Sequence, residues 1–277
     1  MRLRVVNLNV WNDAGDPRRV GIINRELRRL QPDLVALQEV VHTTERNQLE
    51  ELLDGLDLYS THQNDVTATP PFGEKYGGNA VATRWPHRVV EVLDLRLSDA
   101  ADIPWFTLAV SVPVPGEGDV LFIVTTWSWR LEAESARERQ AVAITDLDAR
   151  HRSELPTIIA GDLNAIPQAA SMRYLTGLQS LCGRSVYYHD AWAIAGKGPG
   201  DTWTADNPNA QSVIDQIVRQ PDHRRRIDHV LIGSWQSHPN AHCHIAAATV
   251  AFNEPVDGIW ASDHFGVVVD LDIGTGP

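Results

Sequence analysis

Hydrophobic runs that end in polar side chains recur along the chain, and they predict buried strands with polar ends. The first run extends from Leu3 to Val10 and the second from Asp33 to Leu37. Between them, Val20–Leu30 places its large apolar residues on one helical face and is stopped by Pro32. A strand, a helix and a strand within about forty residues favour an α/β fold.

The middle of the chain shows apolar runs separated by short turns. Arg88–Leu97, Trp105–Val112 and Val120–Thr126 predict successive antiparallel strands, and Glu134–Arg150 predicts the clearest helix. Antiparallel strands together with βαβ units indicate two sheets packed face to face with helices outside. The stretch Ser180–Pro221 lacks such periodicity, and we expect an irregular segment that contributes to substrate specificity.

No repeat, linker or low-complexity tract divides the sequence, so we expect one domain over residues 1–273 and a C-terminal tail at 274–277. A formal charge of −12 disfavours nonspecific adhesion to nucleic acid or to anionic lipid. A locally basic cleft is still compatible with this charge, and Arg224–Arg226 is one candidate for it. Arginine supplies nearly all positive charge, which favours a bidentate guanidinium in any phosphate clamp.

Cysteine usage and the chain start point to a reducing, non-membrane setting. Cys182 and Cys243 are isolated and predict two reduced thiols. The alternation of His242–His244 suits a strand better than a zinc site. Met1–Val6 lacks the apolar segment of a signal peptide, and no apolar run approaches membrane-spanning length. We therefore expect a cytoplasmic protein with no membrane partner, and we infer no obligate protein partner.

Two predicted strands end in groups suited to phosphoester chemistry. Glu39 leaves the second strand, where a carboxylate must be paired, bind a cation or simply begin the next loop. Thr157–Ala165 runs through a glycine into Asp162 and Asn164, which project from one side of an extended chain. Such a pair serves a turn in many proteins. Alternatively, the aspartate activates a metal-bound water and the amide holds a phosphoryl oxygen.

The last two strands carry a carboxylate and an imidazole. Asp263 and His264 precede the apolar run Val267–Val269, where Asp offers a hard oxygen for Mg²⁺ and His holds or moves a proton. The alternative is a capping Asp beside a solvated His. Asp228 lies just inside another strand, so burial favours pairing with His264 or with a neighbouring arginine.

These motifs, in this order, resemble those of the endonuclease/exonuclease/phosphatase superfamily, the deoxyribonuclease-I-like group. The resemblance extends from Asn9 to Gly266, and five motifs at successive strand ends are strong evidence together. The five are Asn9 with Trp11, Gln38–Glu39, Gly161–Asn164, Arg226–Asp228 and Ser262–His264.

The resemblance implies a four-layer αββα sandwich of two packed mixed sheets flanked by helices, and it makes the domain a catalytic one. It also implies Mg²⁺ or Mn²⁺ at the ends of the central strands. Carried over by motif, Glu39 and Asp263 bind the metal, with Asn9 adjacent. The convergence of so many acidic groups on one cleft independently requires a cation.

The same resemblance assigns catalytic roles. Asp162 positions or activates the attacking water, and Asn164 stabilises the phosphoryl oxygens. His264, oriented by Asp228, binds or protonates the phosphoryl group.

One position departs from the family pattern. Many members have Thr-His at the end of the strand before the long helix, whereas this chain has Thr126-Trp127, and tryptophan cannot act as an acid. Trp127 is expected to stack on a base, to contact an apolar group or to be a core or rim residue. With Arg130 and Asn79 it completes the candidate substrate-binding residues. Arg137 and Arg139, near the start of the helix, are solvated or face a bound phosphate.

The sequence thus predicts a phosphoesterase that depends on a divalent metal and hydrolyses a P–O bond of a phosphodiester or phosphomonoester. The acidic balance and the missing histidine favour a small phosphoester or a short single-stranded nucleic acid. An Mg²⁺-dependent endonuclease or exonuclease on DNA or RNA is the first alternative. A non-catalytic binding module that retains the fold is the second.

Overall fold

Two six-stranded mixed sheets form the centre of the computed structural model, which describes residues 1–67, 77–98 and 106–275. The first sheet contains, in spatial order, β13 (Ala241–Ala251), β14 (Gly266–Thr275), β1 (Arg2–Asn9), β2 (Leu34–Val40), β4 (Gly78–Thr83) and β3 (Tyr59–His62). The second contains β5 (Arg88–Asp94), β6 (Phe106–Val114), β7 (Gly118–Thr126), β8 (Ile158–Asp162), β12 (Asp228–Gly233) and β9 (Tyr188–Asp190).

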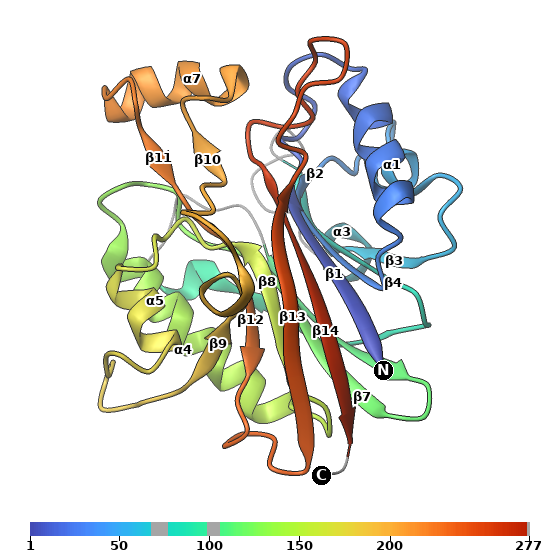
Figure 1. Ribbon diagram of the computed structural model, residues 1–277, viewed down its shortest axis with the longest axis vertical. Helices are drawn as coiled ribbons and strands as arrows, with labels where there is room; N and C mark the ends of the chain where they lie inside the picture. Colours follow the sequence, from blue (N-terminus) through green and yellow to red (C-terminus); the bar gives the residue numbers. More distant parts are fainter. Residues whose placement is uncertain (68–76, 99–105, 276–277) are drawn as a thin grey trace.

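Helices cover the outer faces of the sheets. The first sheet is covered by α1 (Arg19–Leu30) and α2 (Gln48–Leu53), and the second by α4 (Glu134–His151) and α5 (Ala170–Leu175). Figure 1 shows α1 on one outer side of the molecule and α4 and α5 on the other. The shorter helices are α3 (Gln63–Val66) and α6 (Ala191–Ala195). The predicted four-layer αββα sandwich is confirmed.

The alternation of side chains explains why the central strands are apolar throughout. In β1, Leu3 and Val5 belong to the core between the two sheets. Val6 and Leu8, which point to the opposite face, belong to the core under α1 and α2. A strand that is buried on both faces must be apolar at consecutive positions, and this is the pattern that the sequence shows.

Strand direction brings the polar ends together at one edge. β1 and β2 are parallel, with Asn9 opposite Gln38. β14 runs antiparallel to β1, so the residues that precede it lie at the end where β1 finishes. In the second sheet β7 and β8 are parallel, and the antiparallel β12 starts with Asp228 opposite Asp162. The edges of the two packed sheets therefore carry every motif of the sequence at one end of the molecule.

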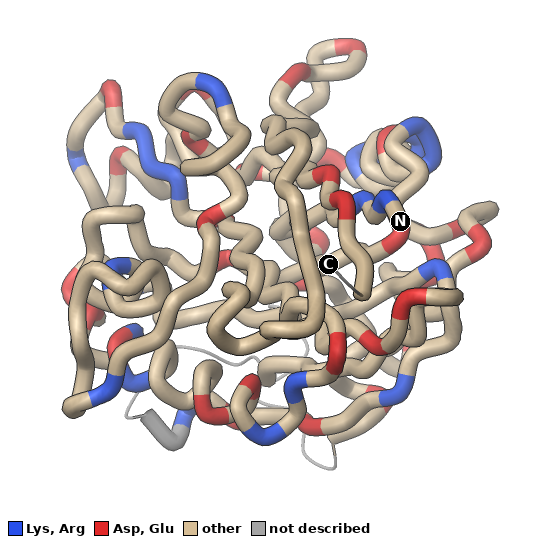
Figure 2. The backbone as a smooth tube through the Cα atoms, turned by 60° about the horizontal axis from the view of Figure 1, so that its bottom comes forward, with Lys and Arg blue, Asp and Glu red and all other residues tan. Residues whose placement is uncertain are grey.

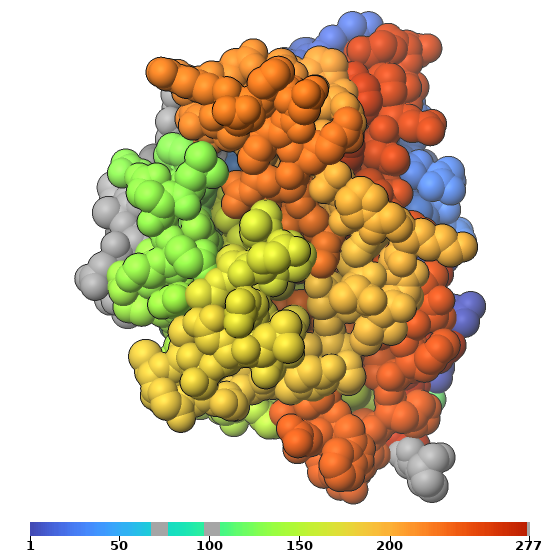
Figure 3. All heavy atoms as spheres, turned by 60° about the vertical axis from the view of Figure 1, so that its left-hand side comes forward, coloured from blue at the N-terminus to red at the C-terminus, as the bar shows by residue number. Residues whose placement is uncertain are grey.

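The stretch predicted as irregular, Ser180–Pro221, is instead largely structured. It contains β9, α6, β10 (Trp203–Thr204), α7 (Pro208–Val213) and a π-helix at Ile214–Val218, and β11 (Arg224–Arg225) follows. We call residues 203–225 the β10–β11 lobe, which projects beyond the sheet edge (Figure 1). In Figure 3 it stands as the orange segment above the green and yellow ones. Its elements are too short for a periodic signal.

Other boundaries differ by a few residues. β14 continues through Gly274 and Thr275, two residues into the predicted tail, while 276 and 277 lie outside the described residues. The strand predicted over Arg88–Leu97 ends at Asp94, because Leu95–Ser98 forms a 3₁₀ turn. Trp105, the predicted start of the next strand, lies outside the described residues.

His242–His244 lies in β13, as its alternation predicts, and both cysteines are free thiols.

Candidate active site

A hydrogen-bonded cluster joins the ends of β1, β2 and β8. The Asn9 side-chain amide donates to Glu39 Oε1 at 3.1 Å and to Asp162 Oδ2 at 3.2 Å. Asn12 donates from Nδ2 to the other oxygen of Glu39 at 2.8 Å. Asn9 is buried and its Oδ1 accepts from the Trp11 amide at 2.9 Å, which fixes the orientation of the side chain. A single amide thus links carboxylates from the two sheets.

A bulge in β2 brings Glu39 into this cluster. The register with β4 shifts between Leu37 and Val40, and Glu39 has a φ of 59°. A left-handed conformation is costly for a residue with a side chain, and such strain is typical of functional positions. Gly77 packs against the bulge, since a Cβ at this position would lie 2.6 Å from the Glu39 carbonyl. Glycine is therefore required here by the close approach of the neighbouring backbone.

Asp162 and Asn164 lie where β8 ends. The Asn164 amide N–H donates to Asp162 Oδ1 at 3.0 Å, and its side-chain amide donates to the Trp127 carbonyl at 3.2 Å. Asn164 has a φ of 50°, a left-handed conformation that Asn tolerates better than most residues. Both oxygens of Asp162 are thus fixed, one by the turn and one by Asn9.

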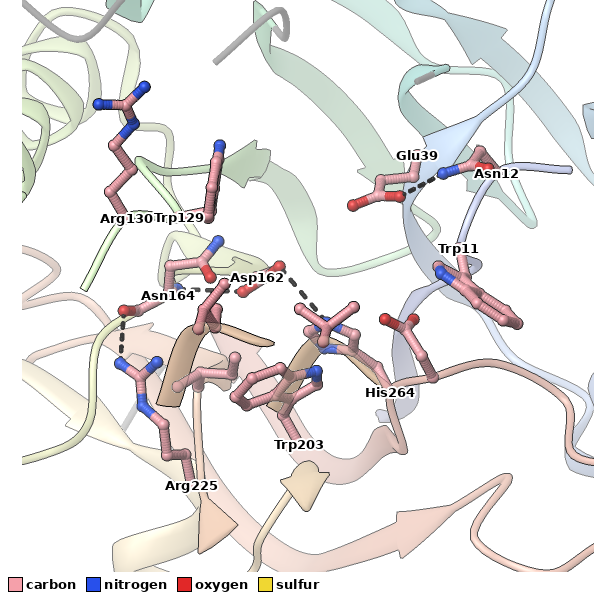
Figure 4. A pocket seen from close by; sticks show the side chains of 14 residues that line it. Trp11, Asn12, Glu39, Trp129, Arg130, Asp162, Asn164, Trp203, Arg225 and His264 are labelled. Carbon is pink, nitrogen blue, oxygen red and sulfur yellow. Dashed lines mark hydrogen bonds and ion pairs between the residues drawn. The ribbon is translucent and has the colours of Figure 1, made fainter. Parts of the chain in front are cut away.

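His264 lies between two carboxylates. Its Nδ1 is 2.9 Å from Asp228 Oδ2 and its Nε2 is 3.9 Å from Asp162 Oδ2. Figure 4 shows Asp162 and His264 pointing toward each other in the middle of the cleft. Asp228 is thus paired with the histidine, while the neighbouring Arg226 forms its ion pair with Asp190 instead. The loop that carries Asp263 and His264 is fixed by Ser262 Oγ, which donates to the Asn9 carbonyl at 2.6 Å.

Burial perturbs the titration of these groups. It raises the pKa of Asp162 and of Asp263 to about 6, and it raises the pKa of Glu39. The repulsion between neighbours adds to this effect, since Glu39 raises the pKa of Asp263 further. For His264, burial disfavours the charge, but the surrounding carboxylates outweigh it and raise the pKa of the imidazole well above its usual value. The surrounding carboxylates therefore favour the protonated form of His264.

The residues fit a hard divalent cation. Carboxylate oxygens are the ligands that Mg²⁺ and Mn²⁺ prefer, and a cation offsets the cost of burying Glu39 and Asp263 together. Among the described residues, one group of acidic and imidazole side chains has all its ligand atoms within 4.8 Å, and it consists of Asp162, Asp228 and His264. Because both nitrogens of this histidine face carboxylates, the group is better suited to hold a proton than a metal.

The raised carboxyl pKa values predict how pH affects the response to a cation. A carboxyl with a raised folded-state pKa stabilises the fold while it is protonated, and this contribution is lost as pH rises from about 4 to about 6. A cation competes with these protons. We expect Mg²⁺ to raise the thermal unfolding midpoint more above pH ~7 than at pH ~5. An equal rise at both pH values in differential scanning calorimetry would contradict it.

These groups line a cleft of about 480 Å³ between the sheet edges and the β10–β11 lobe. Its acidic part is formed by Glu39, Asp162 and Asp263. Arg130 and Arg225 supply positive charge, and Arg225 donates to the Asn164 carbonyl at 3.0 Å. In Figure 4 Glu39 lies on one side of this cleft and Arg225 on the other. Figure 2 shows basic positions scattered among acidic ones over the backbone.

Aromatic and apolar side chains form the walls. Trp11, Trp129 and Trp203 come from three separate loops or strands, and Val213 and Ile217 come from the β10–β11 lobe. Trp129 is 41% exposed, and the guanidinium carbon of Arg130 lies 5.9 Å from the centroid of its ring. The sequence places Trp11 within a motif, Arg225 within the candidate basic stretch Arg224–Arg226 and Trp203 within the segment expected to contribute to specificity. The position of Trp129 had no local signal beyond residue type.

Two predicted substrate-binding residues are corrected. Trp127 is 0% exposed and belongs to the core beneath α4 and α5, which is the core alternative predicted for it, so it does not stack on a substrate. Asn79 is also buried, and its amide accepts from Thr126 Oγ1 at 2.7 Å and donates to the Phe106 carbonyl at 2.8 Å. Both ends of that amide are used by the fold. Arg130, the third candidate, does line the cleft.

Arg137 does not act as either alternative predicted for it. It is 3% exposed, and its guanidinium donates to backbone carbonyls of Ser128, Arg130 and Leu131 and to Glu134. It is neither solvated nor directed at the cleft among the described residues.

Within residues 1–67, 77–98 and 106–275, no helix is both long enough and apolar enough to span a membrane.

The two packed sheets, with the hydrogen-bonded cluster at the ends of β1, β2 and β8, place the protein in the deoxyribonuclease-I-like fold class. The family model for the Endonuclease/Exonuclease/phosphatase family matches residues 6–264, and the chain belongs to this family. Enzymes of the family are generally hydrolases that act on phosphoesters. No curated protein matches the sequence significantly.

Several solved structures share the fold. TDP2 from D. rerio, complexed with a single-strand DNA product, is 18% identical, with a TM-score of 0.72 and coverage of 98% of this chain and 99% of that one. Truncated TDP2 from Caenorhabditis elegans is 17% identical, with a TM-score of 0.71 and coverage of 98% and 97%. An endonuclease/exonuclease/phosphatase from Beutenbergia cavernae is 24% identical, with a TM-score of 0.67 and coverage of 100% and 72%.

Proposed function

We propose that the protein is a divalent-metal-dependent phosphoesterase that hydrolyses a P–O bond by attack of water. The observation that carries this proposal is the arrangement of the carboxylates of Glu39, Asp162 and Asp263 with the imidazole of His264 in a single cleft. Glu39 and Asp263 would hold the metal, with the Asn9 amide orienting Glu39. When bound, Mg²⁺ or Mn²⁺ supplies Lewis-acid polarisation of a phosphoryl oxygen and favours water as a nucleophile near neutral pH.

The remaining groups move or hold protons. Asp162, with a pKa of about 6, is a base strong enough to accept a proton from water and weak enough to be ionised near neutrality. His264 keeps its proton through Asp228 on Nδ1, so its Nε2–H is available to a phosphoryl oxygen. The backbone N–H of Asn164 holds the turn after β8 in place by donating to Asp162. The side chain of Asn164 stabilises the oxygens of the phosphoryl group.

The walls of the cleft favour a small substrate. A cleft of about 480 Å³ matches the usual size of small-molecule sites. Indoles and aliphatic side chains suit an aryl or nucleobase substituent on the phosphate, and Arg225 with Arg130 offsets its charge. A phosphodiester with such a substituent, or a short single strand that stacks on the indoles, is therefore the proposed substrate class.

A nuclease that acts on longer DNA or RNA is the second candidate. The relative from D. rerio is complexed with a single-strand DNA product, which supports a nucleic-acid strand as a ligand for this fold. A binding module without catalysis is the remaining alternative. It predicts that added metal produces no turnover of any phosphoester.

A substrate panel tests these proposals. Protein stripped of metal by a chelator is assayed with and without Mg²⁺ or Mn²⁺ on bis-aryl and mono-aryl phosphates, short single-stranded oligonucleotides, RNA and plasmid DNA. Asp162→Ala controls for contaminating hydrolases. We expect metal-dependent cleavage of the small diesters or short strands. Cleavage confined to plasmid DNA would favour the nuclease, and no cleavage together with no metal binding would favour the binding module.

Glu39→Gln is expected to raise the Mg²⁺ concentration for half-maximal rate by roughly tenfold or more, because a neutral amide is a poorer ligand for a hard cation. The measurement is initial rate against metal concentration. Glu45→Gln, on an exposed position of the following loop, is the matched control. An unchanged metal dependence in Glu39→Gln would remove this residue from the metal site.

Trp129→Ala is expected to raise KM by roughly tenfold while kcat changes little, because loss of one stacking face costs about 1–3 kcal/mol of binding. Steady-state kinetics on an aryl diester measures both constants. Trp235→Ala, with an indole that is 70% exposed outside the cleft, is the control. A fall in kcat at constant KM would instead place Trp129 among groups that act only in the transition state.

A further inference from the structure

Arg19, the first residue of α1, is a buried arginine with an unusual set of partners. It is 2% exposed, yet every hydrogen bond of its guanidinium goes to a backbone carbonyl. Nε donates to Ala14 at 2.8 Å, Nη1 to Val10 at 2.9 Å and Ala261 at 2.7 Å, and Nη2 to Trp11 at 3.2 Å and Asn12 at 3.1 Å.

The five donors of the guanidinium are thus matched by five acceptors. Among the described residues, no carboxylate forms an ion pair with Arg19; carbonyl dipoles solvate the buried charge, and Asp263, Asp13 and Asp16 attract it through space. The guanidinium carbon also lies 5.1 Å from the centroid of the Trp11 ring, within reach of a cation–π interaction. Lysine cannot reproduce this planar set of contacts.

The acceptors lie in two segments that flank the predicted metal ligands. Residues 10–14 follow Asn9, which orients Glu39, and include Asn12, which donates to the same carboxylate. Ala261 precedes the segment that carries Asp263. A single side chain therefore ties together the two loops on which the geometry of Glu39 and Asp263 depends.

We propose that Arg19 is a positioning residue that holds these two loops at the spacing needed to bind the cation. This inference rests on the proposed metal dependence. Arg19 acts through the backbone and touches neither substrate nor metal. Its loss separates the loop that orients Glu39 from the loop that carries Asp263, and the affinity for the cation falls.

Arg137 provides a matched comparison on the other side of the cleft. It lies in the first turn of α4, is as buried as Arg19, and holds the loop that carries Trp129 and Arg130 through backbone carbonyls. None of the predicted metal ligands lies on this loop. Arg137→Met therefore removes an equivalent buried guanidinium while leaving the contacts of Glu39 and Asp263 in place.

The test is direct binding of Mn²⁺ to metal-free protein by isothermal titration calorimetry, with kcat and KM on a cleaved ester as a second readout. We expect Arg19→Met to weaken Mn²⁺ binding roughly tenfold or more, as removal of a group that orients a ligand does elsewhere. Arg137→Met should leave Mn²⁺ affinity unchanged and raise KM. Circular dichroism confirms that each variant is folded, and Arg19→Lys serves if Arg19→Met does not fold.

The outcomes separate the inference from the proposed function. Unchanged Mn²⁺ affinity in folded Arg19→Met would overturn the role of Arg19 while metal-dependent catalysis stands. Full affinity in Arg19→Lys, within about twofold of the unmodified protein, would assign the effect to charge and overturn the carbonyl network as its cause. Equal weakening in Arg137→Met would reveal a general loss of packing and also overturn it. No binding to the unmodified protein would overturn both.

Discussion

Replacement of Asp162 by alanine is expected to lower kcat by roughly 10²–10⁴-fold, the usual contribution of a positioned general base. The carboxylate is fixed by the Asn164 amide on one oxygen and by Asn9 on the other, so no neighbouring group can take its place. Its removal also relieves burial of a charge, and we therefore expect the folded protein to remain as stable or to become more stable. Single-turnover kinetics at saturating metal measures the chemical step.

Asp146→Ala is the control for this experiment. Asp146 is a half-buried aspartate on α4 whose ion pair with Arg184 lies on the surface, where such pairs contribute little. Its kcat should equal that of the unmodified protein. Turnover of Asp162→Ala within a few-fold of that value would exclude Asp162 as the base.

Asp228→Asn is expected to lower kcat by roughly a hundredfold or more, because the amide no longer fixes the tautomer and charge of His264. The Asp228 carboxylate lies 2.9 Å from Nδ1 and raises the pKa of the imidazole. Without it that pKa falls, so the protonated form is lost at lower pH. The alkaline limb of the pH–rate profile should therefore move to lower pH, as measured by kcat over a pH series.

A double-mutant cycle with His264→Ala is the control. If Asp228 acts through His264, the double variant should be no slower than His264→Ala alone. Additive losses would show that Asp228 acts independently of the histidine, and an unmoved alkaline limb would show that His264 does not set it.

Much of the site could be predicted because its residues follow long apolar strands. Asp162 and Asp263 each stand beside a run of buried β-branched residues, and such runs identify strands reliably. Once β1 and β2 are parallel and β14 is antiparallel to β1, those strand ends must meet at one edge. The pairing of Asp228 with His264 also follows from the cost of burying an unpaired carboxylate.

The substrate-facing residues could not be predicted in the same way. Trp127 and Trp129 lie two positions apart, which places them on one side of an extended chain. The chain leaves the sheet after Thr126, however, so Trp127 turns into the core and Trp129 lines the cleft. The one-residue bulge at Glu39 and the β10–β11 lobe depend on contacts between segments far apart in sequence, for which no local pattern exists.

The position of β14 inside the first sheet, between β13 and β1, has a consequence for synthesis of the protein. β14 pairs with β1, with Arg2 opposite Asp272. β1 therefore cannot complete its pairing in the sheet until β14 has been made. Contacts of this sequence separation are slow to form. On the ribosome, β1 and β2 emerge long before Asp263 and His264, and the edge that carries the candidate site can close only after β14 has been made. Loss of β14 by premature termination would therefore leave β1 with an unpaired edge that is open to aggregation, and the loop of Asp263 and His264 without the strand that follows it.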